Sequence, residues 1–432
     1  MEISASSHAM LPSFSRQPSS ACVLQDAFSL ILILGLLSSN CISSSKAADF
    51  NVLNNGAAGD GITDDTQAFQ KAWINACGAR GDNPTVVVPQ GKKFLVKPTV
   101  LNGPCKLPTI TFQVNGEIIA PNSPRAWAGL DQSQWIAFTG VNGLTFSGPG
   151  TINGRGLAWW LQSCRDHPSL KGCTTLAPTA VKFLSCNDLS IADLHFVDAP
   201  QTHVLMMGCN SAYVNNLKVK APGMSPNTDG IHLQDVHNLT ISNSEIRTGD
   251  DCISIGDYTS NVNITHIDCG PGHGISIGSL GKAGNVVQVE NIHVSNVNFT
   301  NTTNGARLKT WQVGKGFVRG ILYENIKVNS VANPIIIDQN YCDKSSCKEL
   351  KTGVKISDVT FRGFTGTSST IIAVNLQCSR AVACTGIVLD NIQLTSNIIK
   401  RPVKSSCVNA HGTTVGMMQS LHVLKQGSED GI

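Results

Sequence analysis

The sequence predicts an all-β, single-domain solenoid, a parallel β-helix with a short helix covering its N-terminal end. Three observations predict this fold: an internal repeat with strand periodicity, no long helical period between its copies, and enough apolar residues (41%) for a large core. Only 14% of the 432 residues are charged, and the formal net charge is +3. This composition excludes a disordered chain and a general nucleic-acid binder.

The repeat is a unit of four mostly apolar positions at spacings of +2, +3 and +2. Eight copies begin at Leu189, Ala212, Leu239, Val262, Ile292, Ile321, Val354 and Ile387. Period-two alternation with a one-residue slip predicts a strand, a bend and a second strand, and Asn or Asp often stands at the bend. Short strands without helices or tight hairpins between them are best stacked as a parallel β-helix. A β-sandwich is the alternative, but it does not explain the recurring register.

The ends of the chain differ from the repeat. Residues 1–47 are expected to be a signal peptide or leader, because Ala27–Leu37 is an apolar run too short to span a bilayer. The solenoid is expected at 48–416, followed by a divergent, poorly ordered tail at 417–432. At 63–77, Phe69, Ala72, Trp73 and Ala76 recur at helical spacing behind capping residues, which predicts the helix that covers the N-terminal end.

Four polar clusters follow consecutive copies of the repeat: Asn227-Thr228-Asp229, Gly249-Asp250-Asp251, Gly272-His273-Gly274 and Arg307-Leu308-Lys309. Taken singly, each has an ordinary explanation as a solvated turn or a surface alternation. Because the clusters occupy similar positions in stacked coils, they would lie on one side of the solenoid, with about 4.8 Å between neighbouring coils. Three carboxylates facing one groove repel one another, and such strain is found mainly at sites that use it.

The chemistry of this combination indicates an enzyme acting on an acidic polysaccharide. Among clustered carboxylates, one that stays protonated can donate to a glycosidic oxygen while others activate water. Arg and Lys beside them can bind a carboxylate carried by the substrate. A groove along a solenoid suits an extended polymer.

The four clusters resemble the signatures of plant polygalacturonases, glycoside hydrolase family 28. The surrounding sequence is similar as well, including SPNTDGIHLQ from Ser225, GDDCISIG from Gly249 and GPGHGISIGSLG from Gly270. The resemblance runs from about Phe50 to about Gly416. It implies a right-handed parallel β-helix that hydrolyses α-1,4 bonds between galacturonates of pectin with inversion, without a metal or other cofactor. It also implies a secreted, monomeric cell-wall protein.

The resemblance assigns roles residue by residue. Asp250 is similar to the general acid, Asp229 and Asp251 to the bases that position water, and His273 to the imidazole that supports the acid. Arg307 and Lys309 resemble the pair that binds the substrate carboxylate. Asn227 resembles a groove contact and Tyr341 an aromatic wall of a neighbouring subsite.

Fifteen cysteines and four sequons (Asn238, Asn263, Asn298 and Asn301) fit a secreted, glycosylated protein. The resemblance and proximity together imply the disulfides Cys77–Cys105, Cys164–Cys173, Cys252–Cys269, Cys342–Cys347 and Cys378–Cys384. Cys186 and Cys209 lie beside apolar strand residues and are expected to be buried thiols. Thirteen cysteines remain after the leader, so at least one is unpaired, and Cys407 is the expected free thiol.

Two other functions remain open at this stage. A pectate lyase would share the fold and substrate but would need calcium-binding carboxylates and an Arg base. A non-catalytic pectin-binding protein would not need clustered carboxylates against an anionic polymer. Endo or exo cleavage depends on loops at the groove ends and is not predicted from the sequence.

Overall fold

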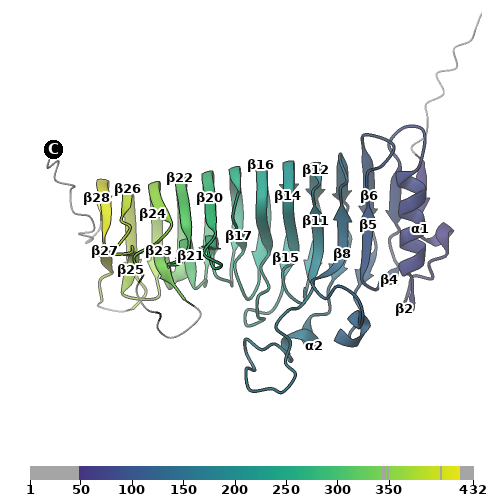
Figure 1. Ribbon diagram of the computed structural model, residues 1–432, viewed down its shortest axis with the longest axis horizontal. Coiled ribbons are helices and arrows are strands. Elements are labelled where there is room, and N and C mark those ends of the chain that lie inside the picture. The colour runs from purple at the N-terminus through teal and green to yellow at the C-terminus, as the bar shows by residue number, and fades with distance from the viewer. Residues whose placement is uncertain (1–47, 343–346, 348–349, 399–400, 419–432) are drawn as a thin grey trace, which may run out of the picture. The chain divides into compact units, whose positions relative to one another are not determined.

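The computed structural model describes residues 48–418 apart from 343–346, 348–349 and 399–400. The leader predicted at 1–47 and nearly all of the tail predicted at 417–432 lie outside the described residues. The strands form one 28-stranded sheet whose pairings are parallel and join each coil to the next (Figure 1). This arrangement is a parallel β-helix, which confirms the predicted fold class.

The coils are built from short strands and four small helices. The helices are η1 (Leu53–Asn55), α1 (Thr66–Cys77), η2 (Pro124–Trp127) and α2 (Leu157–Trp160). The strands of the N-terminal half are β1 (Asp49–Asn51), β2 (Asp60–Asp64), β3 (Thr85–Val88), β4 (Lys93–Leu95), β5 (Thr99–Asn102), β6 (Ile110–Val114), β7 (Glu117–Ile119), β8 (Gln134–Thr139), β9 (Leu144–Ser147), β10 (Thr151–Asn153), β11 (Thr179–Leu184), β12 (Asn187–Ala192), β13 (His195–Val197), β14 (Val204–Asn215) and β15 (Lys218–Lys220).

Several strands of the C-terminal half are longer, because they continue through a corner of the coil. The strands of this half are β16 (Ile231–Arg247), β17 (Ile253–Ile255), β18 (Ser260–Cys269), β19 (Ile275–Leu280), β20 (Val286–Thr300), β21 (Asn304–Trp311), β22 (Lys315–Val331), β23 (Asn333–Tyr341), β24 (Lys355–Ser368), β25 (Ile372–Gln377), β26 (Cys384–Ser396), β27 (Lys404–Val408) and β28 (Ala410–Met418).

The register of the strands follows the sequence repeat. Ile191 pairs with Val214, Val214 with Ile241, and Ile241 with Ile264, so equivalent positions of successive copies stack directly. These side chains point into the core and are fully buried. The predicted bend is a corner at which one residue adopts a left-handed conformation, as at Asp193, Asn216, Asn243 and Asn296. Asn and Asp tolerate this conformation, which explains their recurrence in the repeat.

The seventh copy of the repeat was predicted in the wrong register. It was expected to begin at Val354, but Ile321 pairs with Val359 and Tyr323 with Phe361. The error arose because each coil has a second left-handed corner, which lies just before the first position of the repeat. Asp358 (φ 54°) belongs to that corner, with Asp188 and Asn261 as its equivalents. The two corners carry the same residue types, so the sequence did not distinguish them.

The predicted capping helix is α1, and it lies at the N-terminal end of the coils (Figure 1). Phe69, Ala72, Trp73 and Ala76 are buried as expected. Trp73 packs edge-on against Phe138, with 5.4 Å between ring centroids, so the helix closes the hydrophobic core. The helix begins at Thr66 rather than at residue 63, because residues 60–64 form β2.

All five predicted disulfides are present: Cys77–Cys105, Cys164–Cys173, Cys252–Cys269, Cys342–Cys347 and Cys378–Cys384. Cys186, Cys209 and Cys407 are free, as expected, and the first two are buried. Disulfides in this number indicate folding in an oxidising compartment.

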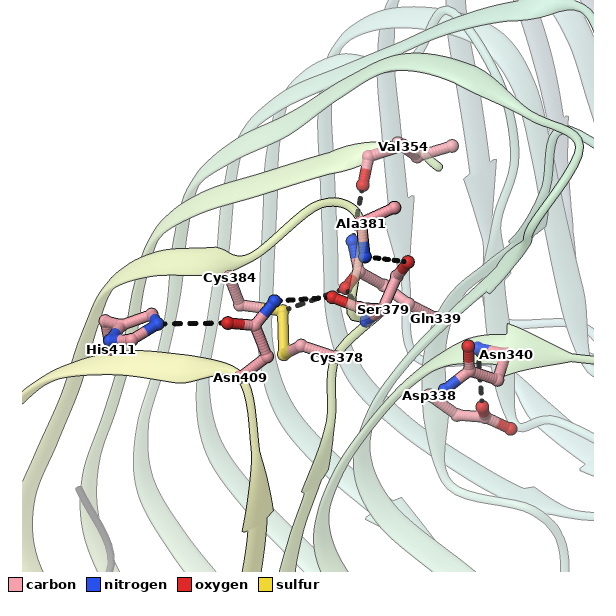
Figure 2. Close-up of a disulfide and its surroundings, with 10 residues drawn as sticks. All are labelled: Asp338, Gln339, Asn340, Val354, Cys378, Ser379, Ala381, Cys384, Asn409 and His411. Carbon is pink, nitrogen blue, oxygen red and sulfur yellow. Dashed lines mark hydrogen bonds between the residues drawn. A yellow bond between two sulfur atoms is a disulfide. The ribbon is translucent and has the colours of Figure 1, made fainter. Parts of the chain in front are cut away.

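The C-terminal coils are held by a buried amide next to the Cys378–Cys384 disulfide (Figure 2). Gln339 Nε2 donates to the carbonyl of Val354 at 2.6 Å, and its Oε1 accepts from the backbone N–H of Ser379 at 2.7 Å. Asn409 donates to the carbonyl of Ser379 at 2.6 Å, which joins the following coil.

The last strand, β28, reaches Met418, two residues past the expected end of the solenoid. No helix among the described residues is both long and apolar enough to cross a membrane.

Candidate active site

One face of the solenoid carries the predicted site residues. On this face, Ile231, Ile253, Ile275 and Ala306 stack in successive coils and point inward, where they are fully buried. Alternation along the strands turns the neighbouring column, His232, Ser254, Ser276 and Arg307, to the outside. Asp229 lies just before β16, and Asp250 and Asp251 lie just before β17. The groove on this face has a volume of about 1010 Å³, and all eight predicted residues line it: Asn227, Asp229, Asp250, Asp251, His273, Arg307, Lys309 and Tyr341.

The turn before β17 presents Asp250 and Asp251 to the groove. Gly249 is required here, because a Cβ on it would lie 2.1 Å from the carbonyl oxygen of Ser225 in the preceding coil. Its backbone N–H donates to Thr228 Oγ1 at 3.0 Å. Cys252 follows immediately, and its disulfide to Cys269 ties the turn to β18. Adjacent coils therefore fix the positions of both carboxylates.

Asp250 is surrounded by hydrogen-bond donors. Its Oδ1 accepts from the backbone N–H of Asp251 at 2.8 Å and lies 3.0 Å from Nδ1 of His273. Its Oδ2 accepts from Nη1 of Arg165 at 2.6 Å. Although burial raises the pKa of this carboxyl group, His273 and Arg165 outweigh burial and hold the pKa of Asp250 well below its usual range.

Asp229 has the opposite environment. Its Oδ2 accepts from Ser254 Oγ at 2.6 Å, but it has no ion pair with a cationic side chain among the described residues. Removal from water, followed by the nearby charges of Asp250 and Asp251, raises the pKa of Asp229 well above its ordinary value. Ser254 is in turn hydrogen-bonded to Nδ1 of His232 at 2.7 Å.

Asp251 is a buried carboxylate with a fixed counter-ion. Its Oδ2 accepts from Lys309 Nζ at 2.8 Å and its Oδ1 from Ser276 Oγ at 2.6 Å. Only 1% of the Asp251 side chain and 9% of the Lys309 side chain are exposed. Lys309 therefore neutralises a charge of the protein itself.

His273 lies between two glycines for a steric reason. Gly274 has φ +85°, and a Cβ on it would lie 2.3 Å from the carbonyl oxygen of Asn304 in the next coil. The backbone N–H of His273 donates to the carbonyl of Asp250 at 2.8 Å. Backbone and ring of His273 thus contact the same residue, which fixes the imidazole against the Asp250 carboxylate.

Arg307 and Tyr341 form one wall of the groove. The guanidinium of Arg307 lies 5.9 Å from the centre of the Tyr341 ring, and Lys309 Nζ lies 5.8 Å from it. Tyr341 packs edge-on against Trp311. Arg307 is half-buried and has no side-chain hydrogen bond among the described residues, so its donors remain available to a ligand.

Sequence reasoning missed several groove residues. His232 and Ser254 could have been found, because they stand at the same outward position as Arg307 once the copies are aligned. Arg165 had no such signal. It comes from the loop between α2 and β11, far from the repeat, and only the folded chain brings it to Asp250.

Asp250, Asp251 and His273 each offer a ligand atom within 4.8 Å of the others, close enough to share a metal ion. However, Arg165 and Lys309 already supply positive charge to the two carboxylates. A divalent cation would have to displace both side chains. We therefore assign no metal to this cluster.

The sequence matches the family model described as "Glycosyl hydrolases family 28" over residues 77–418. The chain belongs to this family. A polygalacturonase from Malus domestica is 46% identical over 82% of this chain and 75% of its own length. A polygalacturonase from Prunus persica is 40% identical over 91% of this chain and 97% of its own length. The predicted resemblance is thereby confirmed, and the chain is a glycoside hydrolase.

Solved structures confirm the fold of this family 28 enzyme. A polygalacturonase from Erwinia carotovora superposes with a TM-score of 0.68 at 24% identity, covering 90% of this chain and all of its own. An endo-xylogalacturonan hydrolase from Aspergillus tubingensis gives a TM-score of 0.71 at 23% identity, covering 84% and 98%. Both support the right-handed parallel β-helix predicted from the sequence.

Within the family 28 site, the two central carboxylates hold their protons unequally. The raised pKa of Asp229 favours its protonated form, while the lowered pKa of Asp250 favours its ionised form. Neighbouring carboxylates with divergent pKa values can divide acid and base roles. Of the two carboxyl groups, Asp229 thus has the greater tendency to keep a proton, and Asp250 has the cation contact.

Proposed function

We propose that this protein is a polygalacturonase that hydrolyses α-1,4-glycosidic bonds between galacturonic acid units of pectin. The observation that carries the proposal is one groove that brings Asp229, Asp250, Asp251 and His273 next to Arg307 and Tyr341. Carboxylates can supply acid and base, whereas the guanidinium can bind the carboxylate of a substrate unit. The polygalacturonases among its relatives support the same substrate class.

The proposed reaction divides the site residues by role. Asp250 protonates the leaving glycosidic oxygen, and Asp229 and Asp251 position and deprotonate the attacking water, with inversion at the anomeric carbon. His273 supports Asp250. Asn227, Arg307 and Tyr341 bind the sugar units, and Lys309 is paired with Asp251 beside the same subsite.

The opposite pKa shifts of Asp229 and Asp250 have a consequence for these roles. Before hydrolysis, Asp250 must gain a proton and Asp229 must lose one. Substrate binding must therefore change the charges around both groups, because each pKa is set by its neighbours.

The proposal extends to the setting of the enzyme. Five disulfides support a secreted enzyme. We further propose that it modifies the cell wall, is glycosylated and acts as a monomer. Endo and exo action are distinguished by comparing the fall in viscosity of polygalacturonate with the release of reducing ends.

The decisive experiment measures reducing ends released from polygalacturonate by the purified protein, with Asp250→Asn as the control. We expect release that persists in the presence of a chelator and yields no unsaturated product. Chelator-sensitive activity with an unsaturated product would instead indicate a pectate lyase, whose metal could occupy the cluster around Asp250. Binding without any cleavage would indicate a pectin-binding protein.

A further inference from the structure

A loop outside the repeat places a cation on the proposed general acid. Residues 161–178 connect α2 to β11 and extend beyond the coils (Figure 1). The Cys164–Cys173 disulfide closes this loop, and Arg165 directly follows the first of its cysteines. Arg165 therefore has a restrained backbone but a long side chain that reaches the groove.

Arg165 contacts two of the proposed site residues with one nitrogen. Its Nη1 donates to Oδ2 of Asp250 at 2.6 Å and to Oδ1 of Asn227. The side chain of Arg165 is 43% exposed, whereas that of Asp250 is 12% exposed. The guanidinium thus covers the groove side of Asp250 while remaining accessible to solvent and to a ligand.

This contact conflicts with the proposed role of Asp250. A general acid carries a proton on one carboxyl oxygen, and Oδ1 of Asp250 is already bonded to the backbone N–H of Asp251. Oδ2 is the oxygen left for the proton, and Arg165 occupies it. A guanidinium has no acceptor atom for that proton, and its positive charge favours the ionised form of the carboxyl group that it contacts. Asp250 therefore holds a proton poorly until Arg165 withdraws.

The other groups that face Asp250 do not remove the conflict. His273 can reverse its hydrogen bond by changing tautomer, but it contacts Oδ1. Lys309 is bound to Asp251, and Asp229 and Asp250 interact, so that the ionised form of either one favours a proton on the other. His273 and Arg165 both lower the pKa of Asp250, and Arg165 is the one of the two that binds Oδ2.

We propose that Arg165 transfers from Asp250 to the carboxylate of a bound galacturonate unit, and that this transfer allows Asp250 to take up the catalytic proton. The inference rests on the proposed function. Guanidinium and carboxylate are matched partners, and the substrate offers one carboxylate per unit. The charges balance: the ion pair with Asp250 is exchanged for one with the substrate, and Oδ2 gains one proton, which Asp229 gives up or solvent supplies.

The transfer makes substrate binding depend on the protonation of Asp250. Below neutrality, wild-type protein should take up about one proton more for each ligand bound than Asp250→Asn, in which this group does not titrate. Isothermal titration in buffers of different ionisation enthalpy measures this number directly. The probe is a thio-linked trigalacturonate, which resists hydrolysis. Asp250→Asn is the control, because its proton uptake on binding comes only from the ligand and from groups other than Asp250.

Arg165→Gln is the test variant, and Lys171→Gln is the matched control because Lys171 is an exposed cation in the same loop. We expect Arg165→Gln to bind the probe about tenfold more weakly, because it lacks one charged contact, and with less proton uptake than wild type. Arg165→Lys should fall between the two. Lys171→Gln should behave like wild type, and thermal midpoints verify folding.

Two results would overturn the transfer while leaving the proposed function standing. One is wild-type protein that binds the probe without proton uptake beyond that of Asp250→Asn. The other is Arg165→Gln with wild-type affinity and uptake, which would leave Arg165 as a structural contact of the loop. Wild-type protein that does not bind the probe would instead refute the proposed function, and the transfer with it.

Discussion

Lys309 donates from Nζ to Oδ2 of Asp251 at 2.8 Å, and both side chains are buried. The sequence placed Lys309 with Arg307 as a pair that binds the substrate. The structure separates the two, because Lys309 has a partner within the protein whereas Arg307 lies half-buried beside Tyr341. Two cations with different surroundings should respond differently to mutation.

Lys309→Met should lower both turnover and stability. It leaves the charge of Asp251 buried without a counter-ion, which typically costs about 3–5 kcal/mol of folding free energy. Arg307→Gln should mainly raise KM for polygalacturonate, by about tenfold, because it removes a contact to substrate. Steady-state kinetics and chemical denaturation of both variants check this. Lys309→Met with normal stability and only a raised KM would show that Lys309 is solely a substrate contact.

Asp250→Asn should lose about 10²–10⁴-fold in kcat while still binding oligogalacturonate, because it removes the proton donor but leaves the groove intact. Binding is measured by titration calorimetry on the inactive variant. Asp250→Asn with unchanged turnover of bound substrate would show that another residue is the acid.

Activity should be highest at acidic pH. The raised pKa of Asp229 and the lowered pKa of Asp250 mean that the cluster retains a shared proton well above the ordinary pKa of a carboxyl group. The proton is lost as the pH rises through the raised pKa, and with it the acid for the reaction. The pH dependence of kcat/KM tests this. A plateau that extends well above neutrality would contradict it.

His203 should make the fold less stable in acid. It is fully buried, its Nδ1 lies 2.9 Å from the carbonyl oxygen of Asp229, and burial lowers its pKa to about 4 from 6.5. Between these values the unfolded chain binds a proton that the folded chain excludes, so stability falls as the pH falls from 6.5 towards 4. The loss should approach about 3 kcal/mol.

Denaturation at a series of pH values measures the slope in this window for wild type and for His203→Gln, which cannot titrate there. The variant should have the shallower slope, and His266→Asn, at an exposed corner, should keep that of wild type. Equal slopes for wild type and His203→Gln would rule out His203 as the source.

Cys407 should be the thiol that reacts in the native protein, but slowly. It is half-buried, and burial raises the pKa of its thiol to about 11, whereas Cys186 and Cys209 are buried. Its labelling rate should rise about tenfold per pH unit between pH 7 and 9, because the thiolate is the reacting form. Mass spectrometry of alkylated protein locates the label, and Cys407→Ser is the control. A label on Cys252 would contradict its disulfide.

The repeat in the sequence determines most of the fold. Apolar residues at fixed spacings specify strands, and a left-handed residue at each corner fixes where a coil turns, so stacking follows from local pattern alone. The same locality explains the error at Val354. Two corners with the same residue types allow two registers, and only the pairing of Ile321 with Val359 decides between them.

The sequence by itself also determined that the eight predicted site residues share one groove, because stacking brings equal positions of neighbouring coils together. It did not determine their charge states. Asp229 and Asp250 are both aspartates near the start of a rung, yet their pKa values move in opposite directions. The difference comes from His273, which the stacked coils place beside Asp250, and from Arg165, which lies 85 residues before Asp250 in a loop without the repeat. Contacts of this kind depend on how a loop folds over the coils, and no local pattern encodes them; only the tertiary structure decided where the cation lies.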